Sequence, residues 1–390
     1  MAIGGRSDSG KGGRIRLGMV GGGEGAFIGA VHRIASRLDD HYELVAGALS
    51  STPDKARRSG EALGLAADRI YDDYESMAET EAKRSGGIEA VAIVTPNHMH
   101  AGPTYAFLKA GVHVICDKPL TVSLAEGKKM KAAVDKSDRI FALTHNYTAY
   151  PLVRRMREMV QGGELGEIRL VQVEYPQDWL AGPTETTGNT QAEWRVDPKR
   201  SGAGGALGDI GTHAFNLADF VTGLELAELS ADPSCFGKGR VLDDNAQIML
   251  RYANGARGAL WVSQVASGEK NELRLRIYGT KGGVNWLQSN PNRMIWTPLG
   301  KSARIVTRGG PDSGEAAARV TRVPPGHPEG YLEGFATIYS EVALAIKAAR
   351  TGKKPPKGVM FPTIDDGMKS LAFVEAAVKS GKANAKWVRP

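Results

Sequence analysis

Residues 17–32, LGMVGGGEGAFIGAVH, place three consecutive glycines between an apolar strand and a helix. A strand that ends at residues 21–23 and continues as a helix near Phe27 presents bare backbone N–H groups and a positive helix end. This geometry binds the pyrophosphate of a dinucleotide. The spacing departs from G-x-G-x-x-G, because Ala26 stands at the third glycine and matching Gly29 requires three extra residues. Glycine runs also form ordinary tight turns, so this stretch alone leaves both interpretations open.

Between residues 15 and 144, short apolar runs alternate with helical patterns, which is typical of a parallel sheet with crossover helices. We predict strands at 15–20, 43–49, 91–95, 112–116 and 140–144, and a weaker one at 69–71. Each strong strand runs into a distinctive group: the three glycines, Ser50-Ser51, Pro96-Asn97-His98, Asp117-Lys118-Pro119 and His145-Asn146-Tyr147. In a doubly wound sheet these ends share one edge, where ligands bind. The sequence therefore predicts a Rossmann-type α/β domain with a ligand cleft at that edge.

After residue 150 the pattern indicates a second α/β domain whose open sheet is largely antiparallel, with a hairpin signal at Asn254-Gly255. We predict helices at 152–161 and 207–221, a long polar segment at 176–205, and strands at 168–175, 226–234, 246–252, 257–265, 273–278, 283–286 and 293–297. We expect residues 300–328 to form a surface loop, and helices at 330–349 and 364–380 to pack back on the first domain. The predicted organisation is a mobile tail at 1–13, a dinucleotide-binding domain at 14–149, and a substrate and oligomerisation domain at 150–390.

Composition excludes several classes of function. Fifty Lys and Arg against 43 Asp and Glu give a net charge of +7, which is scattered apart from a few basic residues near the start. We therefore expect no nucleic-acid partner. Cys116 and Cys235 form no CxxC motif, which argues against a disulfide scaffold and favours a cytoplasmic location. No apolar run is long enough to cross a bilayer, so we expect no membrane partner.

The end of the second strand bears on the choice of cofactor. An Asp or Glu there usually holds the ribose hydroxyls, whereas this chain has Leu49-Ser50-Ser51. Ser50 and Ser51 can donate to a phosphate, and Lys55 or Arg58 on the next helix can pair with one. We therefore predict NAD or NADP and favour NADP. The competing interpretation is that these are solvated helix residues with a Ser or Thr cap.

Lys118 follows the predicted strand 112–116 at the cofactor edge. Pro119 shapes the turn, and the lysine ammonium can reach into the cleft to hydrogen-bond or deprotonate a substrate hydroxyl. The alternative is a surface lysine in a turn.

Asp209 and His213 are spaced i, i+4, so both are predicted on one face of the same helix. A carboxylate beside an imidazole can orient a polyol and take its proton. The alternative is a helix-start carboxylate with a core histidine, but the glycine-rich approach at 201–205 favours a cleft.

The eight histidines form neither an HExxH motif nor a Cys/His cluster, so we expect no metal. Trp179 and Trp194 flank the long polar segment and can stack on a sugar or pack in a core.

These motifs, taken in order, resemble those of the glucose-fructose oxidoreductase and inositol dehydrogenase (Gfo/Idh/MocA) family over residues 14–379. The matching motifs are the glycine loop with Gly29-Ala30-Val31-His32, Thr95-Pro96-Asn97-His98-Met99-His100, Asp117-Lys118-Pro119, Asn146-Tyr147, residues 162–168, Trp194-Arg195 and residues 208–213. The resemblance implies a Rossmann domain followed by an α/β domain whose sheet builds dimers or tetramers.

Carried over by position, Lys118 matches the family's active-site lysine, Asp209 its substrate-binding aspartate and His213 its catalytic histidine. The resemblance also places Asn97 and His100 on the nicotinamide side and Trp194 and Arg195 over the cofactor. With the strand ends, the predicted cofactor-binding residues are Gly21, Gly22, Gly23, Phe27, Ile28, Ser50, Ser51, Thr95, Pro96, Asn97, His100, Asp117, Lys118, Asn146, Trp194 and Arg195.

The chain departs from the family pattern at three places. Asp117 replaces the usual Glu before the lysine, Thr148 stands where many members have Arg, and the glycine loop is three residues longer. These departures bear on a ribose contact, on substrate recognition and on the phosphate contacts respectively.

The predicted substrate site combines Lys118, Gln177, Trp179, Asp209 and His213. No second cluster of Arg or Lys adjoins it, so a neutral polyhydroxylated ring suits it better than a phosphorylated one. We predict an NAD(P)-dependent dehydrogenase that transfers a hydride between nicotinamide and a secondary hydroxyl or carbonyl of a sugar, cyclitol or glycoside. The alternatives are a non-catalytic NAD(P)-binding regulator and an oxidoreductase that recycles a tightly bound cofactor.

Overall fold

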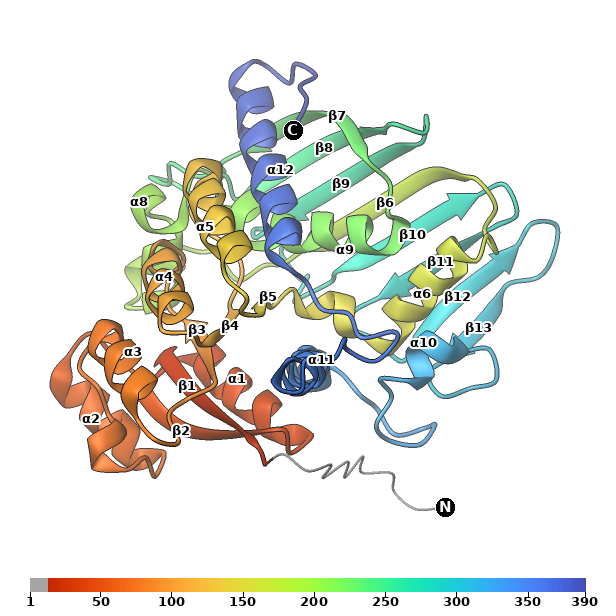
Figure 1. Cartoon of the computed structure of the whole chain (residues 1–390). Helices are drawn as coiled ribbons and strands as arrows, with labels where there is room; N and C mark the ends of the chain where they lie inside the picture. Colours follow the sequence, from red (N-terminus) through yellow and green to blue (C-terminus); the bar gives the residue numbers. More distant parts are fainter. Residues whose placement is uncertain (1–12) are drawn as a thin grey trace. The chain divides into compact units, whose positions relative to one another are not determined.

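The computed structural model describes residues 13–390 (Figure 1), so the predicted tail lies outside the described residues except for Gly13. The chain divides into two compact units. Unit 1 comprises the chain up to Thr121, Ala125–Asn146 and Tyr331–Met368. Unit 2 comprises Val122–Leu124, Tyr147–Gly330 and Lys369–Pro390.

Unit 1 is built on a five-stranded sheet in the order β2-β1-β3-β4-β5, and every neighbouring pair is parallel. The strands are β1 (Ile15–Gly21), β2 (Tyr42–Ala48), β3 (Ala90–Val94), β4 (His113–Cys116) and β5 (Phe141–Leu143). The central strands β3 and β4 are buried along their whole length, as expected for a sheet covered on both faces. The five strong predicted strands are confirmed, whereas residues 69–71 form only a single bridge, from Ile70 to Gly47.

Right-handed crossovers place the first helix on one face of this sheet and the next four on the other. The helices are α1 (Phe27–Leu38), α2 (Pro53–Ala62), α3 (Tyr74–Lys83), α4 (Ala101–Lys109) and α5 (Leu124–Lys136). Helix α11 (Tyr331–Arg350) returns to unit 1 and lies beside α1 (Figure 1). The Tyr42 hydroxyl donates to the Tyr339 carbonyl at 2.9 Å, and the Tyr339 ring packs edge-on against His32. The late helix α11 therefore completes the core of the first unit.

Unit 2 is built on an eight-stranded sheet in the order β13-β12-β11-β10-β6-β9-β8-β7. Its pairs are antiparallel except β6 with β9, which is parallel. The strands are β6 (Ile168–Pro176), β7 (Leu226–Ser234), β8 (Asn245–Tyr252), β9 (Arg257–Ser263), β10 (Arg274–Gly279), β11 (Gly282–Leu287), β12 (Arg293–Pro298) and β13 (Arg304–Thr307). The fold class predicted from the sequence is confirmed.

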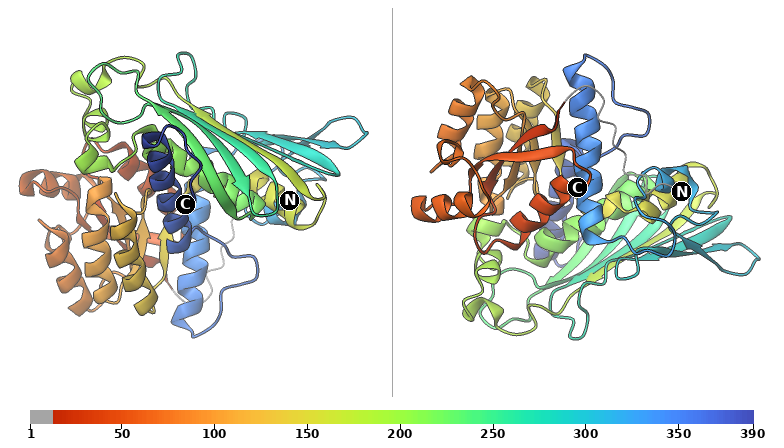
Figure 2. Two further views of the ribbon diagram at one scale, coloured as in Figure 1. Left: turned by 90° about the horizontal axis from the view of Figure 1, so that it is seen from above. Right: turned by 90° about the horizontal axis from the view of Figure 1, so that it is seen from below.

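Helices cover one face of this sheet (Figure 2). Helices α6 (Pro151–Gln161) and α9 (Thr212–Thr222) pack on it, together with the part of α12 (Ile364–Lys382) that belongs to unit 2. The strands alternate buried and exposed residues, most clearly in β8, because only one face meets the core.

Two sequence predictions for unit 2 were wrong in detail. Residues 300–328 contain β13 and the short helix α10 (Gly314–Ala318), which packs on α6 through a hydrogen bond from the Ala316 amide to Glu158. The predicted helix 207–221 begins as a π-helical turn, Leu207–Gly211, before α9. Such short elements leave little local pattern in the sequence, because their stability comes from packing. Within residues 13–390, no helix is both long and apolar enough to cross a membrane.

Candidate functional site

The glycine loop after β1 brings two backbone segments into direct contact. Gly21 and Gly22 have φ of +75° and +72°, a region that side chains disfavour. A Cβ on Gly22 would lie 2.9 Å from the Gly29 Cα, and a Cβ on Gly29 only 2.3 Å from the Gly22 carbonyl oxygen. Gly29 is thus the glycine of the fingerprint that lets the helix approach the strand.

The start of α1 fits an anionic group. Its N-cap is Ala26, which makes no side-chain cap bond to any described residue. Gly25, with φ of +78°, has no heavy atom within 4 Å of where a Cβ would stand. Uncapped N–H groups at a helix N-terminus beside an open glycine bind a pyrophosphate well. The longer loop therefore keeps the chemistry that a dinucleotide requires.

Asp117, directly after β4, is held in its ionised form. Its Oδ1 accepts from the Lys118 amide at 2.9 Å and from the Thr144 hydroxyl at 2.7 Å, and lies 3.9 Å from His32 Nε2. Burial would raise the pKa of Asp117, but the His32 imidazole, the Lys118 ammonium and the Thr144 hydroxyl hold it well below its usual range. The carboxylate fixes the turn that carries Lys118.

His100 and His145 are buried around the same turn. The His100 ring bridges two carbonyl oxygens, of Pro119 at 2.7 Å and Thr95 at 3.0 Å. Burial lowers the pKa of His100, against the opposing effects of Asp117 and of these carbonyls. Burial and the Lys118 charge lower the pKa of His145 to about 3. The His145 imidazole is therefore neutral at pH 7, and both ring nitrogens of His100 lie against backbone carbonyls.

The predicted cofactor residues of unit 1 follow the carboxyl ends of its five strands. These are Gly21, Gly22, Gly23, Phe27, Ile28, Ser50, Ser51, Thr95, Pro96, Asn97, His100, Asp117, Lys118 and Asn146. The remaining predicted site residues belong to unit 2, and they are Gln177, Trp179, Trp194, Arg195, Asp209 and His213.

A closed ring of hydrogen bonds lies beside His213 in unit 2. The hydroxyls of Tyr147 and Tyr175 are 2.7 Å apart, Tyr175 donates to Asn271 Oδ1 at 2.7 Å, and Asn271 Nδ2 donates back to the Tyr147 oxygen at 3.4 Å. The Tyr147 ring meets the His213 imidazole edge-on, with centroids 4.9 Å apart. Gln177 Nε2 also donates to Asn271 Oδ1, at 2.6 Å. These contacts hold His213 and Gln177 in one polar cluster.

Asp209 is the centre of a second set of contacts. Its Oδ2 accepts from Arg195 Nε at 3.2 Å and from Gln264 Nε2 at 2.9 Å. The Arg195 guanidinium lies 4.3 Å from the Trp194 ring and 5.8 Å from the Trp179 ring. The structure thus joins both predicted tryptophans to Asp209 through Arg195.

Two side chains, Asp243 and Arg240, bond to the backbone of the segments that carry Asp209 and Trp179. Asp243 accepts from the amides of Gly205 and Leu207, both at 2.8 Å, and so fixes the start of the π-helical turn. Burial nevertheless raises the pKa of Asp243 to about 6. Arg240 makes a bidentate ion pair with Glu185 at 2.8 and 2.9 Å and donates to the Leu180 and Gly182 carbonyls, both at 2.7 Å. The long polar segment is thereby pinned beside Trp179.

Sequence reasoning missed Gln264 and Asn271. The sequence carried no signal for Gln264, because its place depends on the parallel pairing of β6 and β9. The carboxyl ends of these strands meet at one edge, where the Gln177 backbone N–H donates to the Ser263 carbonyl at 2.7 Å. The strand-end rule that identified the cofactor residues therefore applies to this pair too. Asn271 lies between two strands in a segment without a distinctive pattern.

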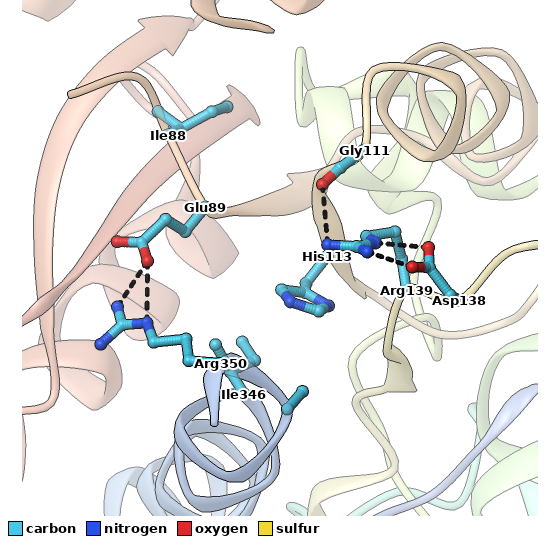
Figure 3. Close-up of a pocket in the computed structure, with 9 residues that line it drawn as sticks. Ile88, Glu89, Gly111, His113, Asp138, Arg139, Ile346 and Arg350 are labelled. Atoms are coloured by element: carbon cyan, nitrogen blue, oxygen red, sulfur yellow. Dashed lines mark hydrogen bonds and ion pairs between the residues drawn. The ribbon is translucent and has the colours of Figure 1, made fainter. Parts of the chain in front are cut away.

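A cavity of about 290 Å³ lies at the opposite, amino edge of the unit 1 sheet (Figure 3). Its two arginines are neutralised by neighbours: Arg350 lies 2.6 Å from Glu89, and Arg139 pairs with Asp138. Burial and the Arg139 charge lower the pKa of His113 in its wall to about 4. At this edge the Arg350–Glu89 ion pair joins α11 to the sheet, whereas the backbone N–H groups at the start of α1 have no side-chain cap.

Known protein families match both parts of the chain, the Rossmann domain and the domain that follows it. The model of the oxidoreductase family with an NAD-binding Rossmann fold matches residues 15–145, and that of the GFO/IDH/MocA C-terminal domain matches residues 153–285. The crystal structure of an oxidoreductase from Sinorhizobium meliloti is 55% identical, with a TM-score of 0.88 over 97% of this chain and 100% of that one.

Two further relatives have named ligands or activities. An inositol dehydrogenase homolog from Azotobacter vinelandii, solved with NADH and myo-inositol, is 33% identical, with a TM-score of 0.91 over 97% of this chain and 98% of that one. The levoglucosan dehydrogenase of Pseudarthrobacter phenanthrenivorans is 28% identical over 96% of this chain and 97% of its own. The chain therefore belongs to the GFO/IDH/MocA family of oxidoreductases.

Proposed function

We propose that this oxidoreductase is an NAD-dependent dehydrogenase that interconverts a secondary alcohol and a ketone on a neutral sugar, cyclitol or glycoside. The observation that carries the proposal is the cluster around Asp209 and His213, where a carboxylate, an imidazole, two amides and two indole rings converge. Such a set suits a ring that carries several hydroxyls.

Each residue has a distinct role in this proposal. His213 takes the proton of the reacting hydroxyl, and Lys118 donates a hydrogen bond to that oxygen and assists the proton transfer. Asp209 accepts from a neighbouring hydroxyl, and Gln177 and Trp179 position the ring. When bound, the nicotinamide supplies the hydride acceptor, or the donor in the reverse direction.

The charges of the cluster favour a neutral substrate. The Arg195 guanidinium faces Asp209 at 3.2 Å, so its charge is balanced inside the protein. A phosphate at this place would need to compete with that carboxylate. The neutral myo-inositol bound by the Azotobacter vinelandii protein supports the same substrate class.

We propose NAD as the cofactor, in place of the NADP that the sequence favoured. The Azotobacter vinelandii relative binds NADH. The uncapped start of α1 and the contact between Gly22 and Gly29 suit the pyrophosphate that both nucleotides share.

The experiment is a screen of the purified protein with NAD and NADP over free sugars, inositols, glycosides and sugar phosphates, read by nicotinamide absorbance. We expect NAD-linked oxidation of neutral rings, and a kcat about 10²–10⁴-fold lower in His213→Ala. Cofactor binding without turnover of any compound would favour the non-catalytic regulator. Oxidation of sugar phosphates alone would contradict the neutral substrate. An absorbance spectrum with bound reduced nicotinamide after purification would indicate a retained, recycled cofactor.

We further propose that a second copy of the chain covers the outer face of the unit 2 sheet, in a homodimer or homotetramer. This face exposes the large hydrophobic side chains of Leu170, Met249, Tyr278, Ile295 and Ile305. Charged residues such as Arg274, Arg276 and Glu174 lie among them. A cavity of about 400 Å³ beside Trp261 offers a recess into which side chains of a partner can fit. Light scattering at micromolar concentration checks this proposal, and a monomer would contradict it.

A further inference from the structure

The second strand of unit 1 ends without the acid that usually binds the adenosine ribose. β2 is followed by Leu49, Ser50 and Ser51, whereas NAD-binding sheets of this kind place an Asp or Glu there. The extra residues of the glycine loop, however, include Glu24. The structure shows where this carboxylate stands.

The loop attaches Glu24 to the end of β2 rather than to its own strand. The Gly23 amide donates to the Leu49 carbonyl at 3.2 Å, and the Glu24 amide donates to the Ser59 hydroxyl of α2 at 3.0 Å. A Cβ on Gly23 would lie 2.6 Å from the Leu49 oxygen, so glycine is needed for this approach. The loop insertion therefore delivers an acid to the place where the second strand lacks one.

Glu24 also faces the cation that a 2′-phosphate would use. Its Oε2 lies 3.6 Å from Arg58 Nη2 on α2, and both side chains are about 60% exposed, at 63% and 62%. Arg58 was one of the residues that made NADP attractive from the sequence. A carboxylate at this distance offsets the guanidinium charge and repels a second anion.

We propose that Glu24 accepts hydrogen bonds from the adenosine ribose hydroxyls and makes the protein select NAD over NADP. This inference rests on the proposed function, since it concerns the same nucleotide site. A phosphate on the ribose would place its charge against the carboxylate, whereas a free hydroxyl would donate to it.

The test measures dissociation constants by calorimetry for NAD⁺ and NADP⁺, without substrate. Loss of one charge-assisted bond in Glu24→Gln should weaken NAD⁺ binding by ~10-fold to ~100-fold. NADP⁺ binding should tighten in the same variant, because Arg58 is no longer offset. Glu61→Gln is the matched control, since Glu61 is an exposed carboxylate of α2, the helix that carries Arg58. This variant should leave both dissociation constants within about twofold of the parent values.

The outcomes separate this inference from the proposed function. An unchanged NAD⁺ to NADP⁺ ratio in both Glu24→Gln and Glu24→Ala, with circular dichroism matching the parent, would overturn the role of Glu24 alone. Binding with the expected ratios but without turnover of any polyol would leave Glu24 in place and overturn the dehydrogenase. A parent protein that bound neither nucleotide would overturn both.

Discussion

The glycine loop of unit 1 and the His213 cluster of unit 2 are built in different ways. At the loop, backbone meets backbone, as in the contact between Gly22 and Gly29, and buried side chains such as His100 hold carbonyl oxygens. In the cluster, side chain meets side chain, as in the ring of Tyr147, Tyr175 and Asn271. The first construction has no room for an added methyl group. The second depends on every polar partner being present.

The largest expected effect comes from adding one carbon to the backbone construction. In Gly29→Ala the new Cβ would lie 2.3 Å from the Gly22 oxygen, so the loop must move away from α1. We expect NAD⁺ binding to be lost in calorimetry and the free energy of unfolding to fall by ~1–3 kcal/mol. Gly330→Ala is the control, because no heavy atom lies within 4 Å of its Cβ position. Parent-like binding by Gly29→Ala would show that the contact is not needed.

A smaller effect should follow from removing one partner of the side-chain construction. Asn271→Leu leaves the Tyr175 hydroxyl and Gln177 Nε2 without the acceptor that they share. We expect kcat/KM for the polyol to fall by ~10-fold to ~100-fold while the NAD⁺ dissociation constant stays constant. Asn285→Leu makes the same change where Asn285 Oδ1 accepts from Arg274 in the same sheet, and should leave kcat/KM unchanged. Equal losses in the two variants would assign the effect to general destabilisation of the sheet.

The last expected effect requires no substitution and concerns acid, which should act on the two units in opposite directions. Burial lowers the pKa of His113 to about 4 and of His145 to about 3, so unfolding of unit 1 takes up protons below pH 6.5 and its stability falls as pH falls. At pH 5 this amounts to ~2 kcal/mol for each histidine. The raised pKa of Asp243, about 6, has the reverse sign, because folded unit 2 binds a proton that the unfolded chain binds only near pH 4.

All six tryptophans lie in unit 2, which makes this prediction measurable. In urea at pH 5, circular dichroism should show a loss of structure before tryptophan fluorescence changes, whereas the two signals should lie closer together at pH 7. His145→Gln should bring the two transitions at pH 5 closer. Coincident transitions at both pH values in the parent protein would contradict the difference between the units.

Most of the fold was predictable, because strands that alternate with helices, or with turns, leave a local hydrophobic pattern. The five strong strands of unit 1 and the helices α6, α11 and α12 were predicted to within a few residues. Short elements such as β13, with four residues, and α10, with five, leave too weak a pattern to predict. The π-helical turn at Leu207–Gly211 was also missed, since its extra residue per turn depends on bonds such as those to Asp243.

The sequence by itself determined the glycine loop, the strand ends and the family motifs, because each depends on residues that are neighbours along the chain. Only the tertiary structure decided which distant side chains meet. Gln264 joins Asp209 because the end of β9 lies against the π-helical turn, and Glu24 reaches β2 because the loop folds over Leu49. Both contacts depend on strand order and on close approach of the backbone. These arise from packing between segments far apart in the sequence, so the local pattern of neither segment predicts them.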